Sequence, residues 1–188
     1  MIIMLTRRFP ILVALAGAAL VSACAPSLGP PPPGGGSRPS TPPPMRGSPN
    51  FSAQDFAWSQ RPGNNVIAGR VAYRQGATRY SCAGAAVVLT PETAWSSRRM
   101  AALYGSTERA ALPADEVRAR TPSAPAGDAG PFVKRTTCDD ADQFAFGGLP
   151  DGSWYAITVV RPTSGNGSTV ALMKRVVVRG GRTVPVTL

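Results

Sequence analysis

Few side chains in this chain of 188 residues could act as acids, bases, nucleophiles or metal ligands. It contains no histidine and ten acidic residues. The absence of histidine excludes Ser-His-Asp and Cys-His arrangements, histidine acid–base catalysis and histidine metal ligands. Neither Lys134 nor Lys174 stands in the Ser-x-x-Lys spacing of serine–lysine enzymes. The sequence therefore predicts a protein without catalytic residues.

The carboxylates cluster at one place, Asp139, Asp140 and Asp142. Acids at alternate positions could offer oxygen ligands to calcium. The twelve-residue loop with its terminal glutamate, by which a common class of calcium sites is recognised, is missing. We interpret these acids as turn residues and predict neither a metal nor a cofactor.

Aromatic and basic side chains are the remaining candidates for recognition. Trp58, Trp95 and Trp154, with Tyr80 and Tyr104, could stack on sugar rings while arginines bind acidic groups. Aromatic residues at such spacing also pack in cores and at strand edges. Glycan stacking and core packing are therefore both open at this point.

The net charge of +10 could attract nucleic acid, anionic lipid or acidic polysaccharide. The basic residues are dispersed singly or in pairs, and no block of five or six like charges occurs. Dispersed charges favour solvated arginines on strand and helix faces. We expect no nucleic-acid partner.

The first 23 residues have the pattern of an export signal. Arg7 and Arg8 precede an apolar run, and small residues lead to a cysteine. The apolar part is about 22 Å long as a helix, too short for a hydrocarbon core of about 30 Å. Its end, Val21-Ser22-Ala23-Cys24, resembles the bacterial lipobox, in which the cysteine is lipidated after cleavage.

This resemblance implies a signal peptide over residues 1–23 and a lipid anchor on Cys24. The residue after the cysteine is Ala25 rather than an aspartate, and in bacterial lipoproteins this favours the outer membrane. The resemblance therefore implies an outer-membrane anchor, with the domain facing the periplasm. The cell surface and the inner membrane stay open as alternatives. A cysteine that stands there by chance is the alternative to lipidation.

Cys82 and Cys138 remain once Cys24 carries lipid. In an oxidising compartment, such a pair predicts a disulfide. The chain-entropy model gives this bridge a stabilisation of about 4 kcal/mol. Two buried thiols are the alternative.

Composition divides the exported chain into a tether and a domain. Residues 25–50 are rich in Pro, Gly and Ser, which predicts a semi-extended linker between the lipid and the domain. Residues 51–188 carry short segments of alternating hydrophobicity, bounded by Gly-rich and Asn-Gly turns, which indicate a β-sandwich. The predicted strands lie at 66–74, 85–89, 143–146, 154–160, 170–178 and 184–188.

One stretch, 93–120, breaks this pattern because Ala, Arg, Met, Leu and Glu replace β-branched residues. Thr93 is a suitable cap for a helix that runs through Met100 and ends at Gly105. A second helical segment is expected from Pro113. We interpret this stretch as a helical insertion lying on the sandwich, and 121–130 as a loop.

The run from Asp140 to Tyr155 resembles the signature of carboxypeptidase regulatory-like domains, also called transthyretin-like or prealbumin-like. The resemblance covers residues 65–188, interrupted by the insertion over 93–130. It implies a seven-stranded Greek-key sandwich with Gly180–Val184 in its last hairpin. It also implies an accessory module, with no catalytic residues to carry over.

These observations predict a mainly β, non-catalytic envelope lipoprotein whose sandwich is a structural or protein-interaction module. The alternative is a peptidoglycan- or polysaccharide-binding module. The expected partners are the membrane, through the lipid, and an envelope protein or cell-wall polymer.

Overall fold

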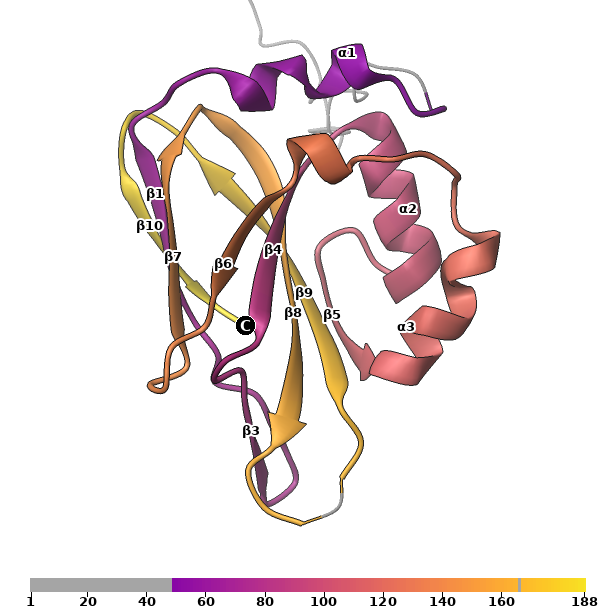
Figure 1. The fold of residues 1–188 in the computed structure, drawn as a ribbon, viewed down its shortest axis with the longest axis vertical. Helices are drawn as coiled ribbons and strands as arrows, with labels where there is room; N and C mark the ends of the chain where they lie inside the picture. Colours follow the sequence, from indigo (N-terminus) through magenta and orange to yellow (C-terminus); the bar gives the residue numbers. More distant parts are fainter. Residues whose placement is uncertain (1–48, 166) are drawn as a thin grey trace, which may run out of the picture. The chain divides into compact units, whose positions relative to one another are not determined.

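Two β-sheets and a helical insertion form the folded part of the chain, and they make three layers in Figure 1. The computed structural model describes residues 49–165 and 167–188. The predicted signal peptide, Cys24 and nearly all of the 25–50 linker lie outside the described residues. Among the described residues, no helix has the length and apolar character to cross a membrane.

The smaller sheet has the order β10-β1-β7. β1 (Asn65–Arg70) runs antiparallel to β7 (Gln143–Leu149) and parallel to β10 (Thr183–Thr187). Alternate residues of β1 are buried, so one face of this sheet points to the core.

The larger sheet has the order β2-β3-β8-β4-β6, with β9 paired to β8 and β5 paired to β9. β8 (Gly152–Pro162) and β9 (Val170–Val178) are its longest strands. The others are β2 (Arg74–Gln75), β3 (Thr78–Ser81), β4 (Ala86–Pro91), β5 (Arg109–Pro113) and β6 (Lys134–Thr137). All of its pairs are antiparallel.

The main core lies between the two sheets. Ile67 and Leu149 from the small sheet, and Leu89, Trp154 and Val178 from the large one, are fully buried in one cluster. Gly69 has no side chain because the ring of Phe144 occupies the place where its Cβ would lie. A second apolar cluster lies on the other face of the large sheet and includes Met100, Leu103 and Met173.

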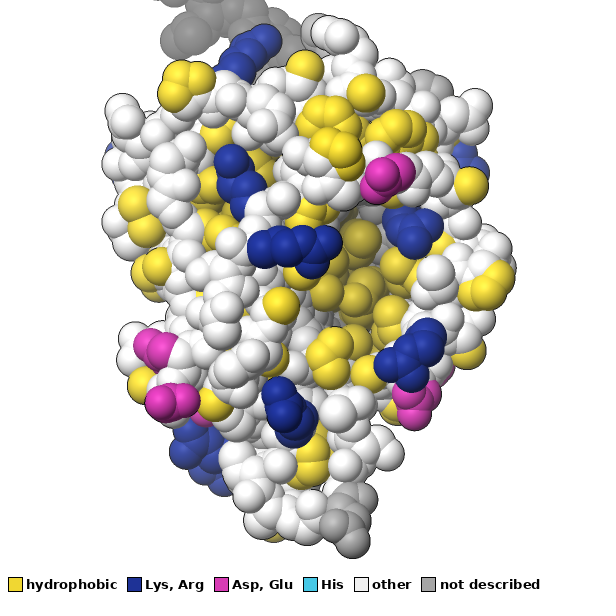
Figure 2. Space-filling view, in the orientation of Figure 1, with side chains coloured by type: hydrophobic (Ala, Val, Ile, Leu, Met, Phe, Trp, Pro, Cys, Tyr) yellow, Lys and Arg dark blue, Asp and Glu magenta, His cyan; other side chains and the backbone are white. Residues whose placement is uncertain are grey.

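The insertion supplies the helices of that second cluster. α2 (Ala94–Tyr104) begins at Thr93, whose hydroxyl accepts a hydrogen bond from the Ser96 amide, and ends at Gly105 in the left-handed conformation. α3 (Ala114–Arg120) follows β5 directly. The remaining helical segments are α1 (Ala53–Phe56) and the 3-10 turns η1 (Ala57–Gln60), η2 (Thr121–Ser123) and η3 (Gly130–Phe132). Beside the insertion, hydrophobic side chains line a hollow over the large sheet (Figure 2).

A partly buried ion pair fixes the insertion to the sheet. Arg175 donates from Nε to both carboxylate oxygens of Glu92, at 2.8 Å each. The hydroxyl of Tyr155 donates to Glu92 Oε1 at 3.1 Å. Burial is the main cause that raises the pKa of Tyr155 to about 12, so this phenol stays protonated.

The structure confirms a mainly β sandwich with a short helical insertion. The described residues form ten strands rather than the seven expected, because β5 lies inside the insertion and a short β2–β3 hairpin extends the large sheet. Residues 180–184 do not form a closing hairpin. Two glycines in the left-handed conformation, Gly180 and Gly181, instead lead the chain across to β10, beside β1 in the other sheet.

The predicted disulfide is present. Cys82 and Cys138 are bonded, with their Cα atoms 5.7 Å apart, and both are buried. The bridge joins the chain just after β3 to the chain just after β6. It lies at the end of the sandwich where β1, β3 and β7 also begin or end.

Candidate functional site

The structure separates the three tryptophans predicted as glycan-stacking candidates. Trp95 is 2% exposed and its Nε1 donates to the carbonyl of Ala126, while Trp154 is fully buried in the main core. The stacking prediction is wrong for these two residues, because their rings pack against the protein. Tyr80 and Tyr104 are buried as well.

Trp58 is half-buried, with its ring edge-on to that of Trp154 at a centroid distance of 5.0 Å. It lines a surface cavity of about 370 Å³ together with Arg61, Asn64 and Asp151. Hydrogen bonds from Asn65 and from the Gly180 amide lower the pKa of Asp151, which is therefore ionised at neutral pH. Of the three tryptophans, Trp58 alone retains a surface that a sugar could contact.

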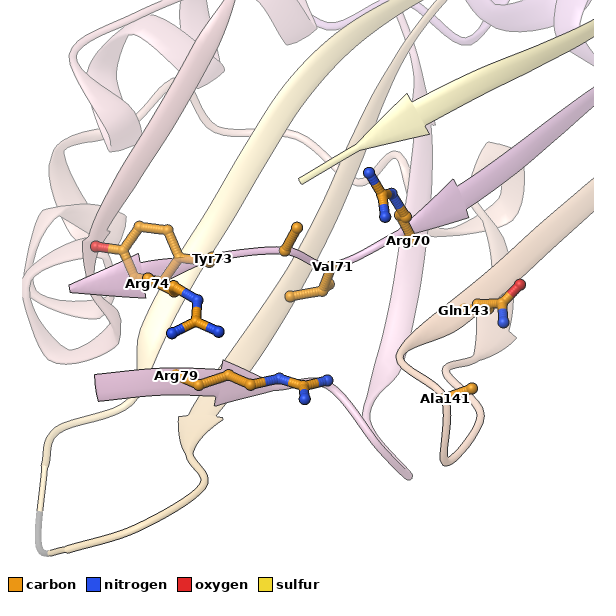
Figure 3. A pocket seen from close by; sticks show the side chains of 8 residues that line it. Arg70, Val71, Tyr73, Arg74, Arg79, Ala141 and Gln143 are labelled. Carbon is orange, nitrogen blue, oxygen red and sulfur yellow. The ribbon is translucent and has the colours of Figure 1, made fainter. Parts of the chain in front are cut away.

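A different cavity gathers positive charge, and we name it the arginine pocket. Its volume is about 470 Å³, and Arg70, Arg74 and Arg79 line it with Tyr73 and Gln143. Figure 3 shows Arg74 directed toward β3, Arg79 extended toward the turn that holds Ala141, and Arg70 on the other side of Val71. The pocket therefore draws its arginines from β1, β2 and β3.

Local structure explains how these arginines meet. Gly76, in the left-handed conformation, turns the chain between β2 and β3. The hairpin places Arg74 directly opposite Arg79. Like charges directly opposite each other in antiparallel strands are destabilising. The pair therefore needs a counter-charge from elsewhere.

Asp142 supplies half of that counter-charge. Its Oδ2 accepts from Arg79 Nη2 at 2.9 Å, and its Oδ1 accepts from Ser81 Oγ at 2.6 Å and from the Cys82 amide at 2.8 Å. Burial acts to raise the pKa of Asp142, but these hydrogen bonds and the Arg79 charge outweigh it and hold the pKa below its usual value. Asp142 is thus a buried, ionised support that orients Arg79.

Arg70 and Arg74 are exposed and form no ion pair with any residue that the structure describes. Asp139 and Asp140 lie in the neighbouring turn and are exposed. Oδ1 of Asp139 accepts hydrogen bonds from the amides of Ala141 and Gln143, so this carboxylate stabilises the turn. The pocket keeps two unpaired guanidinium groups beside a third that is fixed by Asp142.

The arginine pocket continues into a second groove. Arg70 and Gln143 also line a groove of about 450 Å³ that runs over Ala68, Ala145 and Pro185 on the outer face of the small sheet. The shared residues place the two concavities side by side. An extended ligand could therefore occupy both.

The acid and sulfur atoms beneath this pocket do not suit a metal ion. Cys82, Cys138 and Asp142 place possible ligand atoms within 4.8 Å of one another. The two sulfurs are joined in the disulfide, whereas metal ligation requires thiolates. These residues are a structural support.

Sequence reasoning missed the arginine pocket. Arg70 and Arg74 lie in the strand predicted at 66–74, where dispersed charges favour solvated arginines, and Arg79 carries no signal of its own. The available indication was Gly76, which predicts a tight turn and so the approach of the arginines on either side.

The sequence matches no protein-family model and no curated protein. The structure is similar to a crystal structure described as a candidate carbohydrate-binding protein from Pseudomonas aeruginosa. The two share 19% sequence identity and a TM-score of 0.51, over 73% of this chain and 97% of the other. At this identity the comparison establishes a shared fold.

Proposed function

We propose that the folded domain is a non-catalytic module that binds an acidic polysaccharide of the cell envelope. The observation that carries the proposal is the arginine pocket, in which Arg70 and Arg74 lack a partner among the described residues and Asp142 orients Arg79. Guanidinium groups bind carboxylates through two parallel hydrogen bonds. The proposed contact is with uronate or other carboxylate groups of the polymer.

Two features support a polymer as the ligand. The neighbouring groove past Gln143 and Ala145, which Asp139 also lines, gives a chain of sugars room beyond a single residue. The similar crystal structure is described as a candidate carbohydrate-binding protein, which favours a carbohydrate over a protein partner. Because the arginines are exposed, we expect the affinity to fall as the salt concentration rises.

The experiment compares matched variants of residues 25–188, a chain that lacks only the signal and the lipidated cysteine. Isothermal titration with polygalacturonate measures binding, and dextran serves as the neutral polymer. Each arginine–carboxylate contact at this exposed position is worth about 1 kcal/mol. Arg70→Gln combined with Arg74→Gln should therefore weaken binding about 30-fold.

Arg98→Gln combined with Arg118→Gln is the control, because it removes the same charge from exposed positions on α2 and α3. Equal weakening by the control pair would show diffuse charge attraction and refute a built site. Equal binding of dextran would refute the acidic specificity. Absence of binding to both polymers, with a protein captured instead from crosslinked envelopes, would favour a protein-interaction module.

We also propose that this domain is tethered to the outer membrane through lipid on Cys24, as the lipobox resemblance implies. Cys24→Ala should leave the precursor unprocessed. Mass measurement of the native N-terminal peptide tests this directly, because the lipidated cysteine is the expected first residue. Normal cleavage of the variant with full membrane retention would contradict it.

A further inference from the structure

A further concavity lies where the two sheets part, and we name it the β5 groove. It has a volume of about 460 Å³ and is lined by Tyr73, Arg109, Ala111, Leu172, Lys174 and Leu188, among others. Tyr73 also lines the arginine pocket. The lining of the β5 groove is nevertheless different in kind, because most of it is apolar.

The sheet register explains the apolar floor. β5 pairs with β9 and extends the large sheet beyond it. Ala111 lies opposite Leu172, which belongs to the core between the sheets. Directly paired residues share a face, so Ala111 also points to the inter-sheet side. At this edge, the apolar interior of the sandwich therefore reaches the surface.

Positive charge borders this floor. Arg109 lies directly opposite Lys174 and thus on the same face. Lys174 Nζ donates to the carbonyl of Thr187 at 3.1 Å. Neither cation forms an ion pair with a residue that the structure describes. Glu108, which precedes Arg109, places its carboxylate 3.9 Å from Arg175. None of the residues that line the groove is acidic.

We propose that the β5 groove binds a fatty acid. Its carboxylate meets Arg109 and Lys174, and its single alkyl chain lies along Ala111, Leu172 and Leu188. An apolar floor with cations at its border complements an anion attached to a hydrocarbon chain, whereas a polysaccharide would leave that floor unused. This site is independent of the polysaccharide proposed for the arginine pocket.

The test titrates residues 25–188 with octanoate, decanoate and dodecanoate below their micelle-forming concentrations. Each buried methylene contributes about 0.8 kcal/mol, so affinity should rise about fourfold per methylene until the groove is filled. One fatty acid should bind per chain. Dodecanol, which has the same chain without the charge, should bind at least tenfold more weakly than dodecanoate.

Two variants locate the site. Ala111→Trp fills the groove from an exposed strand position and should weaken dodecanoate binding at least tenfold. Arg109→Gln should weaken it about fivefold and reduce the preference over dodecanol. Ala101→Trp and Arg98→Gln, at exposed positions of α2, are the controls and should change neither value. Circular dichroism and unchanged melting establish that each variant is folded.

Affinity that does not depend on chain length, or an Ala111→Trp variant that binds normally, would overturn the proposal. Binding to phosphatidylglycerol vesicles without binding of free dodecanoate would also overturn it, in favour of a membrane-facing surface. Polygalacturonate binding should survive Ala111→Trp, and dodecanoate binding should survive the Arg70 and Arg74 substitutions. Each proposal can therefore fail without the other.

Discussion

Asp142→Asn should destabilise the domain because it removes the buried charge beneath the arginine pocket. Asp142 adopts a positive φ of 62°, in the left-handed region that Asn tolerates nearly as well as Asp. The substitution therefore changes charge with little change in shape or backbone strain. Ser81 Oγ and the Cys82 amide, which donate to Oδ1 of Asp142, would then meet the neutral amide of the asparagine.

The size of the loss follows from these contacts. A hydrogen bond to a charged acceptor contributes about 1.5–3 kcal/mol, against about 0.5–1.5 kcal/mol for a neutral one, so each of the two bonds loses about 1 kcal/mol. The Arg79 side chain is 58% exposed, so its ion pair adds only about 0.5 kcal/mol. We expect the free energy of unfolding at pH 7 to fall by about 2–3 kcal/mol.

The pH dependence gives an independent measurement. The folded protein holds the pKa of Asp142 below its usual value, so this stabilisation is complete above the unfolded pKa of about 3.9. It is lost as the pH falls through the folded pKa. Urea unfolding of Asp142→Asn and the unmodified chain should therefore give curves that differ at pH 7 and converge toward pH 2.

Asp140→Asn is the matched control, because Asp140 is exposed in the same turn. It should change the free energy of unfolding by less than about 0.5 kcal/mol. If Asp142→Asn and Asp140→Asn had equal stabilities at pH 7, or if the difference from the unmodified chain did not depend on pH, the role assigned to the buried carboxylate would be refuted.

Three further changes test the scaffold. Replacing both Cys82 and Cys138 by alanine should cost about 4 kcal/mol and lower the melting temperature, and melting that is insensitive to reductant would contradict a structural bridge. Gly69→Ala should lower the free energy of unfolding, measured in urea, by about 1–3 kcal/mol, because the new methyl group meets the Phe144 ring. Unchanged stability would show that the ring can move aside. Glu92→Gln should lower the free energy of unfolding by about 3 kcal/mol, because the partly buried guanidinium of Arg175 loses its carboxylate partner. Calorimetry that finds no change would show that solvent replaces this contact.

Local patterns predicted much of the sandwich. Short runs rich in Val, Ile and aromatic residues, bounded by Gly-rich turns, located β8 and β9, and Thr93 with Gly105 marked both ends of α2. These features are encoded within a few residues of one another. Capping and strand periodicity need no knowledge of distant parts of the chain.

Features that depend on distant pairing were missed. The Ala-rich segment Arg109–Pro113 has no β-branched residue, and it is a strand because β9 offers it a hydrogen-bonding edge. The direction in which Trp95 and Trp154 point is likewise set by packing rather than by residue type. The arginine pocket combines arginines from three strands with Gln143 from a fourth, so its existence depends on a hairpin and on a turn some 60 residues away.

The parallel pairing of β10 with β1 affects the order in which this protein can fold. The Arg182 amide donates to the side chain of Asn65, a contact between residues 117 positions apart. During synthesis, β1 therefore emerges long before its parallel neighbour β10 exists. We expect the small sheet to close only after β10 has been made, and folding to be slow, since such distant contacts carry a large entropic cost of loop closure.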